Sequence, residues 1–72
     1  MNLSLAIEGQ EYIIKDVDTF DEELDAFLFS LGCYSGEPIT VVSRKKKTCV
    51  VSIKDSRYCI DSDLAAAIEV FE

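Results

Sequence analysis

Few side chains in this sequence are of the types that enzymes use for catalysis. There is no histidine, and the cysteines, Cys33, Cys49 and Cys59, lie 16 and 10 residues apart with no C-x-x-C pair. Catalysis by nucleophiles needs a base beside the nucleophile, and no serine or cysteine here lies in a motif that supplies one. The three glycines match neither a phosphate-binding loop nor a dinucleotide-binding fingerprint. We therefore expect a binding protein rather than an enzyme, and no cofactor.

Acidic side chains form a second group that could do chemistry, because carboxylates bind hard cations. Six of the fourteen acidic residues fall within ten positions: Asp16, Asp18, Asp21, Glu22, Glu23 and Asp25. The EF-hand spacing fails, since it requires glycine at Asp21 and glutamate at Phe27. Softer metals would need histidine or paired cysteines. We expect no metal site here and interpret the cluster as the solvated start of a helix.

Basic residues are concentrated in one run, in which Arg44, Lys45, Lys46 and Lys47 supply four of the seven. The formal net charge of −7 opposes nucleic acid and anionic membranes, so we expect no nucleic acid partner. The run has two interpretations. It is either a solvated hairpin tip that discourages edge-to-edge aggregation, or a docking contact toward an acidic protein surface or lipid headgroups.

The length of 72 residues allows one core, so residues 1–72 are expected to form a single domain. No apolar run approaches the roughly 18 residues that span a bilayer, and the first ten residues lack the basic start of a secretion signal. The odd cysteine count argues against a disulfide framework, so all three are expected to be reduced. These features predict a cytoplasmic location.

Hydrophobic periodicity predicts two strands and then a helix. Residues 3–7 alternate in polarity, which favours a strand or extended arm, and residues 12–17 form a strand whose apolar start predicts a doubly covered or closed sheet. A helix is expected from about Phe20 to Leu31, with Thr19 and Glu22 spaced as a capping box. Its apolar stripe consists of Phe20, Leu24, Phe27, Leu28 and Leu31. The phenylalanines are expected to be mostly core, and Gly32 suits the left-handed residue that ends a helix.

The second half of the chain predicts a β-meander and a final strand. The strands are expected from Ile39 to the basic run, at 48–53, at 58–60 and at 68–71, with a short helical turn capped by Asp61 or Ser62.

The register of the 48–53 and 58–60 strands depends on the turn between them. A two-residue loop at Asp55-Ser56 places Ile53 opposite Tyr58, with Cys49 on the same apolar face and Cys59 on the other. The cysteines are expected to serve chiefly as small buried hydrophobes.

Short motifs follow one another in a particular order. They are Leu3-Ser4-Leu5, Gly9, Ile14, Leu28 to Gly36, Ile39 to Val42, and Ile60 with Ala65, Ile68 and Val70. The set resembles the FeoA family, ferrous iron transport protein A, over the whole chain. The family usually has Leu-x-x-Leu-Gly-x-x-Pro-Gly before an Ile-x-Val strand. Ser35 replaces the proline here, and the excursion after the third strand is shortened to the basic run.

The resemblance implies a mainly β fold, a small SH3-like β-barrel of about five strands with one inserted α-helix and a short C-terminal helical turn. It also implies a non-catalytic accessory of the FeoB permease, which contacts either the GTPase domain or the membrane portion and meets the membrane only through that partner. At the position of Cys59 relatives commonly carry a small apolar residue, which implies that both faces of the hairpin are buried.

Two aromatic residues lie off the main helix stripe, Phe29 and Tyr34, and one of them is the best exposed anchor for a partner. With the run Arg44–Lys47 they form the predicted docking residues. The alternative function is a free-standing SH3-like adaptor or regulatory domain that binds peptides and has no transporter partner.

Overall fold

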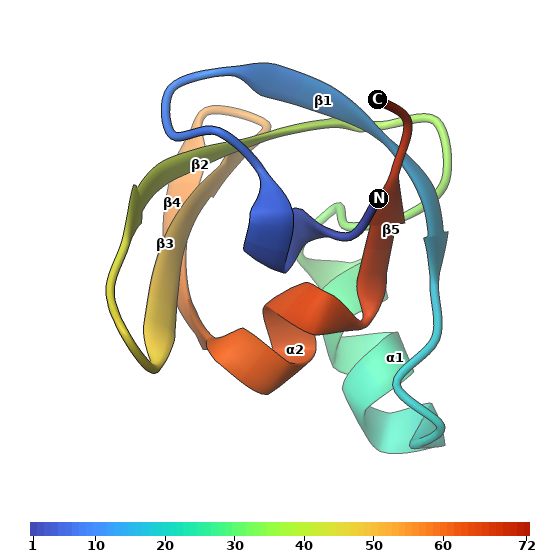
Figure 1. The fold of residues 1–72 in the computed structure, drawn as a ribbon. Helices are drawn as coiled ribbons and strands as arrows, with labels where there is room; N and C mark the ends of the chain where they lie inside the picture. The colour runs from blue at the N-terminus through green and yellow to red at the C-terminus, as the bar shows by residue number, and fades with distance from the viewer.

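Five antiparallel strands form one curved sheet in the order β4-β3-β2-β1-β5, in a computed structural model that describes residues 1–72 (Figure 1). The strands are β1 (Glu11–Val17), β2 (Pro38–Arg44), β3 (Thr48–Ile53), β4 (Ser56–Asp61) and β5 (Ile68–Val70). The helical segments are the 3-10 turn η1 (Leu3–Leu5) and the α-helices α1 (Glu22–Ser30) and α2 (Ser62–Ala66). The predicted mainly β architecture, with one inserted helix and a short C-terminal helical turn, is confirmed.

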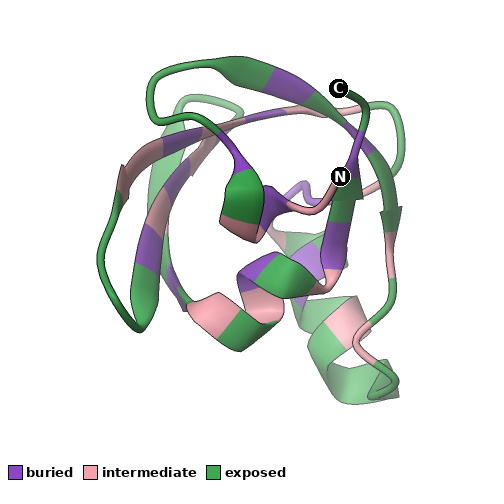
Figure 2. Ribbon diagram, in the orientation of Figure 1, coloured by how far each residue is buried: buried purple, intermediate pink, exposed green.

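The hydrophobic core lies inside the curve of the sheet, which wraps around η1 and α2 (Figures 1 and 2). Fifteen buried apolar residues form one cluster, with members from all five strands. The two α-helices contribute one buried residue each, Leu28 from α1 and Ala65 from α2. Neither helix is long and apolar enough to cross a lipid bilayer.

Strand β1 is covered on one face only. It lies between β2 and β5, as expected for an inner strand, and buries Tyr12 and Ile14. Ile13 points the other way and is 41% exposed, so the prediction of a doubly covered strand is wrong at this residue. Alternate side chains of a strand point to opposite faces, and only the concave face of this sheet meets the core.

The first segment is a 3-10 turn and not the predicted strand. The Asn2 side chain accepts a hydrogen bond from the backbone N–H of Ser4 at 3.0 Å and caps the turn. Leu3 and Ala6, three residues apart, are buried, whereas Leu5 is exposed. The alternating polarity was therefore misleading, because one turn of 3-10 helix brings every third residue to the same face.

Helix α1 begins later than the capping-box spacing predicted. Asp21 is its N-cap and accepts hydrogen bonds from the N–H groups of Glu23 and Leu24 at 2.9 and 3.3 Å. The hydroxyl of Thr19, the predicted cap, instead donates to the Asp25 carboxylate at 2.7 Å. A carboxylate accepts backbone N–H bonds at a helix start as readily as a hydroxyl does, so local pattern alone could not decide between them.

Most of the predicted apolar stripe of α1 faces solvent. Phe20 lies before the helix and is 94% exposed, and Phe27 is 51% exposed, so the expectation that the phenylalanines are mostly core is wrong. Leu28 is buried and Leu31 is half-buried. The stripe predicted a wide buried face, but the short helix reaches the core along one edge.

The β3–β4 hairpin turns one residue earlier than expected. Lys54 and Asp55 form its two-residue loop, both at positive φ, as the tight hairpin turn requires. Ile53 therefore pairs with Ser56, and Val51 rather than Ile53 lies opposite Tyr58. The shift is two residues along β4, and an even shift leaves every side chain on its predicted face.

The two faces of this hairpin differ in burial. Cys49 is buried, whereas Cys59 is exposed. The derivation from alternation is correct at Cys59, and the family-based expectation of two buried faces is wrong there. The interpretation of all three cysteines as buried hydrophobes holds for Cys33 and Cys49 only.

Gly32 ends α1 in the left-handed conformation, with φ of 94°. The N–H of Cys33 donates to the Leu28 carbonyl, and that of Gly32 to the Phe29 carbonyl, both at 3.0 Å. This pair of bonds is the Schellman motif and satisfies carbonyls that a helix end leaves free. The predicted role of Gly32 is confirmed.

Replacing Gly32 with valine is expected to lower the free energy of unfolding by about 1–3 kcal/mol, measured by chemical denaturation. A side chain here would be strained at positive φ, and a Cβ would lie 3.0 Å from Lys54 and 3.2 Å from Ile53. Gly36 is the matched control, because its φ is 91° and a Cβ there meets nothing within 4 Å. Equal losses for Gly32→Val and Gly36→Val would show that crowding at Gly32 contributes nothing.

Candidate docking surface

The basic run forms the tip of the β2–β3 hairpin, as predicted. The backbone N–H of Lys45 donates to the Thr48 carbonyl at 2.8 Å and closes the turn. Lys45, Lys46 and Lys47 are exposed and form no ion pair. These three lysines are called the basic tip below.

Arg44 differs from the three lysines because it is tied to the N-terminal segment. Its guanidinium donates to the carbonyl of Ala6, and its backbone N–H donates to the Glu8 carboxylate at 2.7 Å. Arg44 therefore holds the base of the hairpin against the segment that follows η1. The lysines alone are free to meet a partner.

The two predicted anchor residues lie against each other. The ring centroids of Phe29 and Tyr34 are 4.8 Å apart, in a tilted arrangement that is favourable for aromatic pairs. Phe29 is 64% exposed, whereas Tyr34 is half-buried. The Phe29 ring is therefore the more exposed member of the pair, and Tyr34 packs against it.

Lys54 fixes the position of Tyr34. Its ammonium group donates to the Tyr34 hydroxyl at 2.9 Å, lies 5.1 Å from the ring centroid and pairs with Glu37 at 3.4 Å. The hydrogen bond to Tyr34 and the nearby Glu37 carboxylate raise the pKa of Lys54, so this contact persists across the physiological range. The aromatic pair and Lys54 together are called the aromatic cluster.

The basic tip and the aromatic cluster lie at opposite ends of strand β3. The tip precedes Thr48, and Lys54 follows Ile53, so the six-residue strand separates them by about 20 Å. The sequence placed both sets in one docking site. The structure instead presents two patches, which one partner could reach only across a broad interface.

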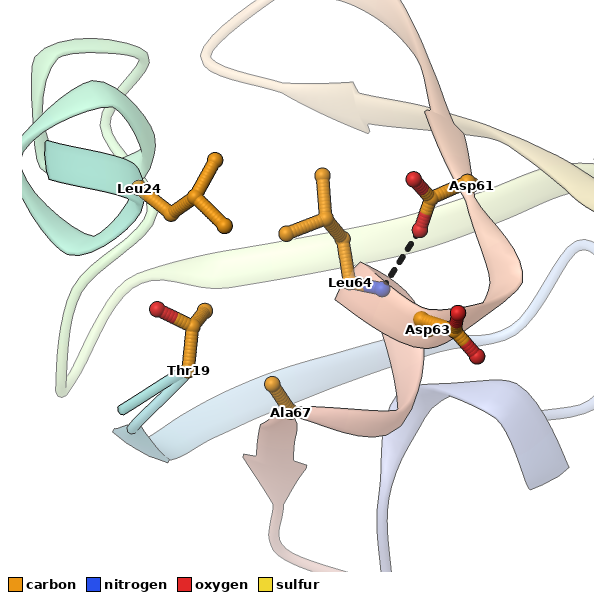
Figure 3. Close-up of a pocket in the computed structure, with 6 residues that line it drawn as sticks. All are labelled: Thr19, Leu24, Asp61, Asp63, Leu64 and Ala67. Atoms are coloured by element: carbon orange, nitrogen blue, oxygen red, sulfur yellow. Dashed lines mark hydrogen bonds between the residues drawn. The ribbon is translucent and has the colours of Figure 1, made fainter. Parts of the chain in front are cut away.

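A groove that the sequence reasoning missed lies between the start of α1 and α2 (Figure 3). Its volume is about 300 Å³, and it is called the α1–α2 groove. The lining residues are Thr19, Leu24, Asp61, Asp63, Leu64 and Ala67. Residues some 40 positions apart in the chain meet here, so no local pattern could have identified it. The only sequence signal for the groove was Leu24, an apolar residue of the predicted helix stripe for which the sequence identified no packing partner.

Two of the three thiols are shielded from solvent. Burial raises the pKa of Cys33 to about 11 and also raises the pKa of Cys49. Cys59 is exposed on β4. Nowhere do three histidine, cysteine, aspartate or glutamate side chains gather in an arrangement that could hold a metal ion.

Small SH3-like proteins share this architecture. The closely similar solved structures include Stenotrophomonas maltophilia FeoA complexed with zinc, described as a prokaryotic SH3 domain protein (TM-score 0.88, 18% identity, 99% of this chain and 89% of that one). A FeoA described as an iron uptake regulatory protein matches with a TM-score of 0.87 at 22% identity, over 97% of this chain and 93% of the other.

The model of the FeoA domain matches residues 1–71, and the chain belongs to the FeoA family. Iron(II) transport protein A from Clostridium thermocellum is 28% identical with a TM-score of 0.87, and the match covers 97% of this chain and 44% of that one. A manganese-dependent transcriptional repressor has the same fold over 40% of its length, at 19% identity and a TM-score of 0.87. No curated protein matches the sequence at a significant level. The family is associated with ferrous iron transport.

The buried Cys33 thiol is expected to make folding stability depend on pH above about 9. In the folded state the Cys33 thiol has a pKa of about 11, which is above its pKa in the unfolded chain. The contribution of the buried thiol to the free energy of unfolding is therefore complete below the unfolded pKa and is lost as pH rises toward 11. The free energy of unfolding of wild type and of Cys33→Ala is measured between about pH 8 and about pH 11, a range that spans the pKa of the thiol in the unfolded and folded states. Lysine and tyrosine titration is common to both, so identical slopes would contradict the assignment.

Proposed function

We propose that this protein is a non-catalytic accessory subunit that docks on a FeoB-type ferrous iron permease from the cytoplasmic side and modulates iron uptake. The observation that carries the proposal is the family match over residues 1–71. A relative of this fold is described as a candidate activating factor for bacterial ferrous iron transport. An accessory subunit needs no catalytic group, and the chain offers surfaces suited to binding.

Two patches supply complementary kinds of contact in this proposal. The basic tip is a compact positive region on a chain of net charge −7, which favours approach toward an acidic surface of the permease. Phe29 is an exposed aromatic ring backed by Tyr34, the arrangement typical of an interface anchor. The tip would act on encounter and orientation, and the anchor on the lifetime of the complex.

A second candidate function follows from the occurrence of the same fold within a manganese-dependent repressor. In that case the chain would be an SH3-like adaptor or regulatory domain that binds a peptide and has no transporter partner. Copurification with native membranes that contain the permease distinguishes the two functions. An adaptor would stay in the supernatant, whereas an accessory subunit would sediment with the membranes.

Reversing the charge of the basic tip is expected to slow association with the purified permease. The variant Lys45→Glu/Lys46→Glu/Lys47→Glu keeps Arg44 and its contacts to Ala6 and Glu8. Electrostatic steering acts mainly on the association rate, so its salt dependence should flatten while dissociation changes little. Surface plasmon resonance measures both rates, with Lys15→Glu on β1 as a control. Unchanged rates at low and high salt would reduce the tip to a solvated loop.

Truncating the aromatic anchor is expected to speed dissociation instead. Phe29→Ala should weaken binding by about 2 kcal/mol if the ring is central to the interface, because a buried aromatic anchor acts mainly on complex lifetime. The ring is 64% exposed, so the fold should remain intact. Phe71→Ala is the matched control, since Phe71 is 55% exposed on another part of the surface. Equal effects of the two truncations would place the interface elsewhere.

A further inference from the structure

The floor of the α1–α2 groove is apolar and lacks a cover. Leu24 of α1 and Leu64 of α2 face one another across it (Figure 3), and Ala67 closes one end. Leu24 belongs to a stripe whose spacing predicts burial, yet it is 38% exposed. Covering these side chains would remove apolar surface from water, which is favourable at roughly 25 cal/mol per Å².

The rim of the groove is acidic. Asp63 makes no hydrogen bond and no ion pair, and Asp61 uses one oxygen to accept from the N–H of Leu64 at 2.8 Å. Asp61 and Asp63 both lie on the α2 side of the groove. No basic side chain lines the groove.

Further acidic residues lie ahead of and within the first turn of α1. They are Asp18, Asp21, Glu22 and Glu23. None of them takes part in an ion pair. An apolar floor beneath unpaired carboxylates attracts a ligand that brings apolar surface and positive charge together.

We propose that the α1–α2 groove binds a partner segment that presents an apolar side chain flanked by lysine or arginine residues. The source of that segment rests on the proposed function. Membrane proteins carry an excess of lysine and arginine beside the cytoplasmic ends of their spanning helices, so a permease offers such segments next to apolar residues. The acidic rim disfavours direct contact with anionic lipid.

The groove is distinct from the aromatic cluster, and α2 lies between it and the basic tip. The N–H of Ser62, the first residue of α2, donates to the Lys47 carbonyl at 3.0 Å. Along one side of the molecule the tip of the β2–β3 hairpin is followed by α2 and then by α1 (Figure 1), and the groove is lined by residues at the starts of these two helices. A bound segment would be aligned by charge, with its basic residues toward Asp61 and Asp63.

Two synthetic peptides test the proposal with the full chain. One is an amphipathic helix with leucine along one face and lysine on the other, and its counterpart has glutamate in place of each lysine. Fluorescence anisotropy measures affinity, and amide chemical shifts locate the site. The lysine peptide is expected to bind, more weakly at high salt, and to shift the amides of Leu24, Leu64 and Ala67.

Two matched pairs of variants separate the floor from the rim. Leu24→Ala should lower the affinity for the lysine peptide by about fivefold. Phe27→Ala, on the same helix but outside the groove, should leave the affinity unchanged. Asp63→Lys should weaken it by about fivefold at low salt, while Glu11→Lys on β1 should not. All four positions are exposed, so the fold is expected to persist in each variant.

The other outcomes overturn either the groove as a site for basic segments or the permease as the source of the segment. Equal binding of the two peptides, or equal effects within each variant pair, would mean that the groove does not select basic segments. Shifts of the groove amides with protein concentration alone would assign it to a second copy of the chain. Peptide binding without competition by the purified permease would leave the groove intact and refute the permease as its source. Permease binding that Asp63→Lys leaves unchanged would support docking through another surface.

Discussion

The attachment of α1 to the sheet depends on one buried side chain and one tight turn. Leu28 is the only buried residue of the helix, and its carbonyl also accepts the N–H of Cys33 across the turn at Gly32. Ile53 and Lys54 press against that turn, so the tip of the β3–β4 hairpin and the helix end hold each other. Phe29 and Leu24 project from this short helix, and both proposed binding surfaces rely on its placement.

The small size of the core explains why so many apolar side chains remain exposed. A chain of this length buries only roughly 60% of the surface that it exposes when unfolded. Fifteen apolar residues form the core, and the exposed large ones gather mainly on α1 and near the N-terminus. Exposed apolar side chains at helical spacing, without a partner in the same chain, are typical of interaction surfaces.

Charged side chains divide the surface of the molecule into regions of opposite sign. Within the basic run, Arg44 is held by neighbouring groups, whereas the three lysines of the basic tip form no ion pair. Lys54, by contrast, is occupied by Tyr34 and Glu37 and orders the aromatic cluster. The acidic groove lies on the other side of α2 from the tip. A partner that met all three would need acidic, apolar and basic elements in a defined order.

Local physical chemistry in the sequence determined the strands, the end of α1 and the faces of the β3–β4 hairpin. Gly32 had to follow the last helical residues because few other residues tolerate positive φ, and the alternation at Cys49 and Cys59 survived a wrong loop because the error was an even shift. Tertiary structure decided the rest. Asp21 and not Thr19 caps α1, and the Thr19 hydroxyl donates to the Asp25 carboxylate instead. Leu3 is buried through a 3-10 turn and not through a strand. The α1–α2 groove exists only because Leu24 and Leu64, 40 residues apart, meet in space, and contacts between distant segments leave no local pattern to predict.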